Sequence, residues 1–336
     1  MAEEDNKKRL LYILDMMKKT DENHPLNSTQ IIEKLAEKGI KAERKAVSRD
    51  VKFLGEFDFL KYTIHTCNNH NLGWYMTDQE FEDYEIKMLV DAVASAKFLT
   101  LEGSRNLIKK IKNLATIEGE HLIEETMIMD PEIKIDDKKF NIKFDTIMRA
   151  ITDHKQLRFQ YYEMTASNKK VLKRDGYMYQ VSPYFIVLSG EEYFLIANPN
   201  THNHVTYFRI EMITNMEICD ESARPMREIE ELKDINQSRT IADYLRENVS
   251  MWNGETVSVT LRGKNNLRHD VMRKFGRNIM IRDEGKEEFI AHVRVANSEG
   301  FYYWLASYGP YITIEGPKDV RQGYIEFLKN SLKRYE

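Results

Sequence analysis

The apolar positions in the first quarter of the chain recur with the period of a helix. Leu10, Ile13, Leu14 and Met17 occupy i, i+3, i+4 and i+7, which places them on one stripe. Asn27, three residues before a glutamine, has the spacing of a capping box and marks the start of a second helix. The pattern predicts three helices, over residues 6–19, 27–39 and 41–54.

The predicted third helix has two chemically different faces. At about 100° per residue, Val47, Val51 and Leu54 fall within about 60° of one another and form an apolar stripe. The side chains of a separate arc of about 140° are basic or hydroxylated, and the acidic residues of the helix lie outside that arc. The residues of this arc are Arg44, Lys45, Ser48, Arg49 and Lys52. A mixed-charge helix is often only a solvated face, so the neighbouring elements must decide between the two interpretations.

Two β-rich stretches follow the third helix. Residues 59–65 and 72–76 are joined by a polar Asn/His turn, which is the pattern of a hairpin. Three short helices, the third of them basic, followed by a hairpin describe a winged helix-turn-helix over residues 1–76. In such a domain the third helix enters the major groove, so this context favours binding of double-stranded DNA over a solvated face.

The middle of the chain changes from helical to strand periodicity. Residues 77–153 have amphipathic stripes without candidate chemistry, and we interpret them as a helical linker and dimerisation region. In residues 154–220, turn residues recur about every ten positions, which predicts a small antiparallel β barrel or sandwich. The expected strands are residues 157–162, 180–188, 192–197, 205–210 and 213–218.

The last third of the chain divides into a polar segment and a regular domain. Residues 221–253 are predicted to be a linker with short helices near 229–232 and 241–247. Residues 254–336 alternate in the order strand, helix, strand, strand, helix, strand, which is the ferredoxin-like order, and end in a further helix. The expected fold class is therefore multidomain α+β.

Length, composition and charge narrow the class of protein. The 336 residues suffice for two or three domains, and 42% hydrophobic with 31% charged residues is typical of a soluble globular chain. No apolar run is long enough for a membrane span, and the acidic start does not resemble a signal peptide, so we expect a cytoplasmic protein. Cys67 and Cys219 lie in different predicted domains, which argues against a disulfide. Because the formal net charge is -4, any binding of nucleic acid has to be local.

Three motifs resemble those of the bacterial WYL-domain transcription regulators. The run Val47-x-Arg49-Asp50-Val51-x-x-Leu54 resembles the recognition helix of the DeoR-type winged helices at the N-terminus of that family. The segments Gly190-x-x-Tyr193-Phe194-Leu195 and Phe208-Arg209-Ile210-Glu211, together with Pro183-Tyr184, are similar to the WYL domain. The stretch from Trp304 to Pro310, followed by Ile312-x-Ile314-Glu315-Gly316-Pro317, resembles the C-terminal extension of the family. The resemblance implies an Sm-like small β barrel for residues 154–220.

The chain departs from the family pattern at three places. Tyr193-Phe194-Leu195 stands where the family has Trp-Tyr-Leu. The indole of the first residue and the hydroxyl of the second residue are therefore missing. Met212 stands where the family often has a second arginine. Lys173 and Arg174 lie earlier in the chain and are candidates to replace a basic residue that the family places before Pro183.

The resemblance implies two sets of site residues. In the third helix, base contacts are expected from Arg44, Lys45 and Ser48, and phosphate contacts from Arg49 and Lys52. In the β domain, the resemblance implies a sensor for a nucleotide or single-stranded nucleic acid, because arginine binds phosphate and tyrosine stacks on bases. The candidate effector-binding residues are Arg209, Tyr193, Tyr184, Ser182, Lys173 and Arg174. The alternative is that the tyrosines belong to the strand core and that Arg209 pairs with Glu211 or Glu217.

No constellation of catalytic residues stands out. The sequence has no phosphate-binding glycine loop, nucleophile elbow or His-Glu-x-x-His motif, and His121, Glu124 and Glu125 are expected to lie on the surface of a polar helix. We therefore expect neither an enzyme nor a cofactor or bound metal. The predicted function is a ligand-responsive, homodimeric transcriptional regulator that reads a near-palindromic DNA site. The alternative is an accessory protein that binds single-stranded nucleic acid through its β domain without promoter function.

Overall fold

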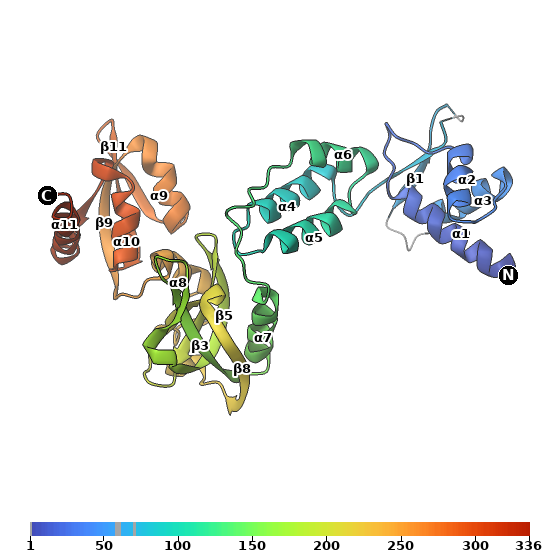
Figure 1. Ribbon diagram of the computed structural model, residues 1–336. Helices are drawn as coiled ribbons and strands as arrows, with labels where there is room; N and C mark the ends of the chain where they lie inside the picture. The colour runs from blue at the N-terminus through green and yellow to red at the C-terminus, as the bar shows by residue number, and fades with distance from the viewer. Residues whose placement is uncertain (1, 58–61, 70–71) are drawn as a thin grey trace. The chain divides into compact units, whose positions relative to one another are not determined.

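The computed structural model describes residues 2–57, 62–69 and 72–336 and is a mixture of helices and antiparallel sheets (Figure 1). The chain forms two compact units, Met1–Asp136 and Asp137–Glu336. Within the described ranges, no helix combines the length and the apolar character needed to cross a bilayer.

The first unit begins with the three predicted helices, α1 (Ala2–Met17), α2 (Ser28–Glu37) and α3 (Arg44–Gly55). The capping box is confirmed, because the Asn27 side chain accepts from the backbone N–H groups of Thr29 and Gln30 while the Gln30 side chain accepts from the Asn27 N–H. The apolar stripes of the helices meet in one core. Its buried members include Ile13, Met17, Ile31, Leu35, Val47, Val51 and Leu54.

A short antiparallel hairpin follows these helices. Strands β1 (Thr63–Thr66) and β2 (Trp74–Thr77) pair with each other, while residues 59–61 of the predicted first strand lie outside the described part of the chain. Leu26, between α1 and α2, adds a bridge to Trp74 on the other side of β2. Gly73 permits this approach, because its φ is +97° and an added Cβ would lie 2.0 Å from the Leu26 carbonyl oxygen.

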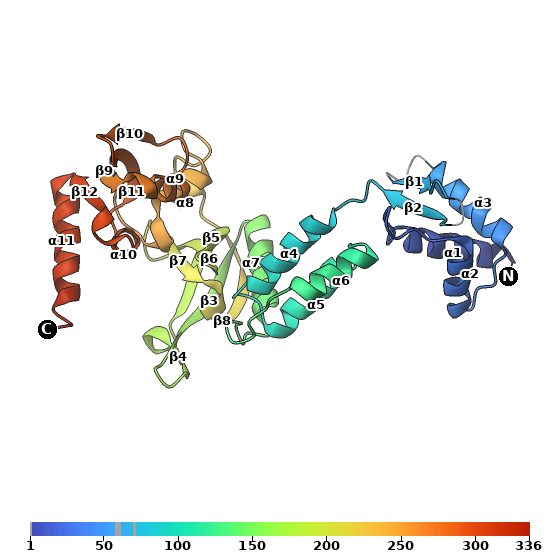
Figure 2. The same ribbon diagram turned by 90° about the horizontal axis from the view of Figure 1, so that it is seen from above.

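Three further helices complete the first unit. Helices α4 (Asp83–Ser95), α5 (Leu101–Lys112) and α6 (Ile117–Thr126) pack around a small apolar core, and α4 and α5 run side by side in Figures 1 and 2. Lys19, just after α1, donates its ammonium group to the Asn113 and Ala115 carbonyls at the end of α5, at 2.5 and 3.0 Å. This contact joins the three-helix region at the start of the unit to the α4–α6 bundle.

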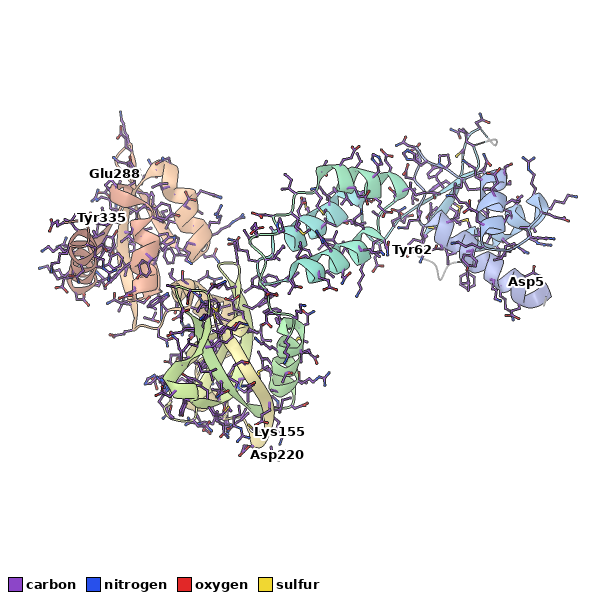
Figure 3. The ribbon with its side chains drawn as sticks, in the orientation of Figure 1. Asp5, Tyr62, Lys155, Asp220, Glu288 and Tyr335 are labelled. Atoms are coloured by element: carbon purple, nitrogen blue, oxygen red, sulfur yellow. The ribbon has the colours of Figure 1, made fainter. Side chains whose placement is uncertain are left out.

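The second unit opens with helix α7 (Phe140–Thr152) against a six-stranded antiparallel sheet. The strands follow the order β4-β3-β5-β6-β7, and β8 pairs with β3. Lys155 donates to the Asp220 carbonyl, and the two residues lie together at one end of the β3–β8 pair (Figure 3). The five predicted strands are all present, and β4 is an additional one. Their bounds are β3 (Lys155–Met164), β4 (Lys170–Leu172), β5 (Met178–Ser189), β6 (Glu192–Pro199), β7 (Thr206–Arg209) and β8 (Ile213–Ser222).

The polar segment of residues 221–253, predicted to be a linker with short helices, packs against the β domain. Helix α8 (Ile241–Glu247) matches its prediction, but residues 229–232 form turns instead of a helix. Five apolar side chains of this segment complete the core of the β domain. They are Ile229, Leu232, Ile235, Tyr244 and Met251. The sequence signal failed here because the few apolar residues are buried through irregular backbone, which has no period to detect.

The C-terminal domain has the predicted order of elements. Its antiparallel sheet follows the order β10-β11-β9-β12, so the first and third strands of the domain are central, as the ferredoxin-like order requires. The elements are β9 (Thr256–Lys264), α9 (Arg268–Phe275), β10 (Met280–Glu284), β11 (Glu288–Ala296), α10 (Glu299–Ala306), β12 (Ile312–Gly316) and α11 (Lys318–Leu332).

Candidate nucleic-acid interface and effector cavity

Helix α3 presents the predicted polar face to solvent. Val47, Val51 and Leu54 are at most 4% exposed and anchor the helix in the core of the first unit. The five side chains of the polar arc are all exposed. They are Arg44, Lys45, Ser48, Arg49 and Lys52. The amphipathic geometry inferred from the sequence is therefore the geometry of the folded helix.

The electrostatics of α3 depend on a contact that the sequence reasoning missed. Arg9 of α1 donates its Nε to the Asp50 carboxylate at 2.7 Å, and both side chains are largely buried. This pair neutralises the carboxylate of Asp50 beside the basic face. One feature of the sequence could have revealed this ion pair. Arg9 lies four residues before Ile13, on the apolar stripe of α1, and a buried arginine needs a charged or hydrogen-bonding partner.

The exposed cations of α3 are only partly engaged within the protein. Arg44 donates to the Thr29 hydroxyl at 2.9 Å, and Lys52 lies 3.7 Å from the Glu56 carboxylate. Among the residues described, the side chains of Lys45, Ser48 and Arg49 have no hydrogen bond or ion pair. These three side chains are therefore free to contact phosphates or base edges.

The six candidate effector residues lie in several places in the β domain, and only Lys173 and Arg174 line one cavity together. Arg209 is exposed and pairs with Glu192, with 3.1 Å between Nε and Oε2, rather than with Glu211 or Glu217. Its backbone N–H donates to the Tyr161 hydroxyl at 3.1 Å. Glu217 is bound by Arg158 instead.

Three of the other candidates serve packing. Tyr193 contacts the rings of Phe140 and Phe144 on α7, with 5.0 Å between the centroids of Tyr193 and Phe144. Tyr184 is buried and donates to the Arg224 carbonyl, and burial raises the pKa of its hydroxyl to about 12. The Ser182 hydroxyl, also buried, accepts from the Arg224 N–H at 2.9 Å. Tyr184 therefore belongs to the packed interior, whereas Tyr193 is half-buried against α7.

Lys173 and Arg174 line a cavity of about 540 Å³ in the β domain. Aromatic residues from three strands and the preceding turn form much of its wall, and polar side chains from the β6–β7 loop complete it. The aromatic lining consists of Tyr161, Tyr177, Tyr179, Tyr207 and Phe208. The sequence analysis missed these residues because they converge from β3, β5 and β7. No periodicity within one strand groups them, because Tyr207 and Phe208 are consecutive in β7 and Tyr177 precedes β5.

The backbone positions the two cations at this cavity. Arg174, Asp175 and Gly176 all have positive φ angles, of 51°, 54° and 80°, which is an unusual run for residues with side chains. The Arg174 guanidinium lies 5.7 Å from the centroid of the Tyr179 ring, and Lys173 pairs with Glu163 at 3.2 Å. Burial raises the pKa of Tyr161 to about 12, so its hydroxyl stays neutral at ordinary pH. Cations beside neutral aromatic rings suit a ligand that has phosphate groups and bases.

Two segments of the chain match models of known protein families. The family model described as "WYL domain" matches residues 143–218, and the model described as "WCX domain" matches residues 255–332. No curated protein gives a significant match to the sequence.

Two solved structures align with most of this chain but share little sequence with it. Proteasome accessory factor B/C (PafBC) of Arthrobacter aurescens is 17% identical, with 98% of this chain and 49% of that chain covered and a TM-score of 0.28. A protein described as CRISPR Cas-related is 12% identical. The alignment covers 97% of this chain and 85% of that chain, with a TM-score of 0.36. This chain thus spans about half the length of the PafBC structure. From the two family matches, the chain carries a WYL domain followed by a WCX domain.

Proposed function

We propose that this protein is a DNA-binding transcriptional regulator that responds to a nucleotide or a short single-stranded nucleic acid. In this proposal, residues 1–76 act as a winged helix-turn-helix whose third helix, α3, reads double-stranded DNA. Two copies of the chain bind a near-palindromic site as a homodimer, and the WYL domain binds the effector.

The observation that carries the proposal is the exposed face of α3. Four cations and one serine face solvent from a helix whose opposite side is fixed in a core. Asp50, which would oppose a phosphate backbone, is instead paired with Arg9. This local positive surface supplies the attraction for DNA that the net charge of -4 does not.

The effector part of the proposal rests on the cavity lined by Lys173 and Arg174. Its cations offer contacts for phosphate, and exposed aromatic rings such as that of Tyr177 offer stacking surfaces for bases. An effector alters DNA binding only if it binds one arrangement of the dimer better than the other. We therefore expect the effector to change the affinity for DNA by the same factor by which DNA changes the affinity for the effector.

The test is selection of bound sequences from a random duplex pool, with and without candidate nucleotides and short single strands. The proposal expects one near-palindromic motif whose recovery changes when one effector is added. Arg44→Ala should relax the preference at particular base pairs, whereas Lys52→Ala should weaken all duplexes evenly.

Failure to bind any duplex at low ionic strength would overturn the proposal. If such a protein still bound single strands, and lost that binding on Arg174→Ala, the accessory-protein function would replace it, since the cavity lined by Lys173 and Arg174 would then carry the activity.

A further inference from the structure

A second cation-lined cavity, of about 620 Å³, lies between α8 and the C-terminal domain. Its walls come from α8, from the turn between α9 and β10, and from β10 and β11. The titratable side chains that line it are Asp243, Arg246, Glu247, Arg277, His292 and Arg294. None of these residues lines the cavity that holds Lys173 and Arg174, so the two sites are separate.

Positive charge exceeds negative charge around this cavity. Arg246 pairs with Asp243, and Arg294 lies with its Nε 3.3 Å from the Glu247 carboxylate, which Arg239 also binds. With Arg277 included, three arginines and two carboxylates line the cavity. Within the described parts of the chain, the Arg277 guanidinium has no hydrogen bond or ion pair. One positive charge, that of Arg277, is left without a compensating carboxylate in the lining.

The backbone brings these cations together. Gly276 has a φ of +98°, and an added Cβ would lie 3.4 Å from the Cδ of Arg246, so the turn passes close to that side chain. The same turn carries Arg277 into the wall of the cavity. His292 is bound through Nδ1 to the Thr260 hydroxyl at 3.1 Å, which directs its Nε2 away from that contact.

We propose that this cavity is a binding site for the phosphate group of a nucleotide or of a single-stranded nucleic acid. A guanidinium group offers a planar fork of donors that matches phosphate, and Arg277 offers it without first breaking an ion pair. Phe275, Ile279 and Met280 supply apolar lining for a sugar or base beside the phosphate. The volume is within the usual range for small-ligand sites.

A purely structural role accounts for only part of this cluster. Ion pairs explain Arg239, Arg246 and Arg294, because each contacts Asp243 or Glu247, and the Arg294–Glu247 pair joins α8 to the C-terminal domain. They do not explain Arg277, which is exposed and holds no carboxylate among the residues described. A variant of Arg277 therefore distinguishes phosphate binding from a purely structural role of the cluster.

The experiment titrates the full chain with inorganic pyrophosphate, ADP and a thymidine hexanucleotide by calorimetry at fixed ionic strength. Arg277→Ala should weaken binding of pyrophosphate and ADP at least tenfold without changing the unfolding temperature, because one charged hydrogen-bonding group is lost. Arg277→Lys should give an intermediate affinity, since it keeps the charge and loses the fork. Arg273→Ala, an exposed arginine of α9 outside the cavity, is the matched control and should bind like the original protein.

The arms of the experiment identify the source of the phosphate. If the hexanucleotide and ADP compete, and Arg277→Ala weakens the binding of both, the site binds a phosphate group of nucleotides and of single strands alike. If Arg277→Ala weakens the binding of ADP alone, the site is specific for nucleotides. Tyr177→Ala, in the cavity of the WYL domain, should leave pyrophosphate binding unchanged, so this site can fail or hold independently of the proposed effector cavity. The proposal is overturned if no probe binds, or if Arg277→Ala binds all three probes as tightly as the original protein.

Discussion

The exposed face of α3 and the cavity lined by Lys173 and Arg174 both offer cations to nucleic acid, but they are built differently. On α3, Lys45 and Arg49 project freely from a regular helix into solvent. In the WYL domain, a turn with left-handed backbone holds Arg174 near the ring of Tyr179. The first surface is suited to phosphates and base edges of a duplex, and the second to unstacked bases. We therefore expect salt to weaken duplex binding more steeply than effector binding.

The largest expected effect concerns the support of the α3 face. Arg9→Met leaves the largely buried Asp50 carboxylate without its partner, which should lower the free energy of unfolding by about 3 kcal/mol. Chemical denaturation of the full chain, followed by a probe in the first unit, measures this loss. The double variant Arg9→Met with Asp50→Leu should recover most of it, because no unpaired charge then remains. Equal loss in the single and double variants would show that the pair itself is unimportant.

The next effect separates the two surfaces directly. Lys45→Ala with Arg49→Ala should weaken duplex binding about a hundredfold, since two charged contacts are lost, and should reduce the salt slope by about 0.9, since only Arg49 of the two is expected to contact a phosphate. Fluorescence anisotropy over a series of salt concentrations measures both quantities. Lys109→Ala with Lys110→Ala removes the same charge from exposed positions of α5 and should have little effect. A similar loss in both double variants would mean that bulk charge, rather than the α3 face, attracts DNA.

A smaller effect tests stacking in the WYL domain. Tyr177 is 42% exposed at the cavity, so Tyr177→Ala should weaken binding of a thymidine hexanucleotide about tenfold with little change in salt slope. Duplex binding without effector should stay the same. Tyr311→Ala, which truncates an exposed tyrosine of the C-terminal domain, is the control for loss of an aromatic surface. Equal hexanucleotide binding by all three proteins would exclude Tyr177 from the effector site.

The smallest effect is expected at Arg209. Its side chain pairs with Glu192 at the surface and does not line the cavity, so Arg209→Ala should change effector affinity less than threefold and unfolding free energy by less than about 1 kcal/mol. Calorimetric titration with the hexanucleotide measures the first quantity and denaturation the second. Complete loss of the effector response would return Arg209 to the binding site.

The sequence predicted the α3 face better than the effector site, because the residues of the α3 face are neighbours in the chain. The α3 face could be predicted because its core stripe and its polar arc belong to one helix, and helical geometry relates neighbours by a known angle. The candidates in the β domain were chosen by motif, and four of the six lie away from the cavity. Ser182 and Tyr184 bind the Arg224 backbone, which is 42 and 40 residues away in the chain. No local pattern reports such a contact.

By itself, the sequence determined the helices of the first unit, the strands of the WYL domain, the order of elements in the WCX domain and the polar face of α3, because these follow from periodicity, capping and turn residues. Only the tertiary structure decided that Arg9 neutralises Asp50, that residues 229–235 enter a core, and that tyrosines from β3, β5 and β7 share a cavity with Arg174. Each of these depends on which distant segments exclude water together, and that is a property of the packed chain rather than of any short stretch of it.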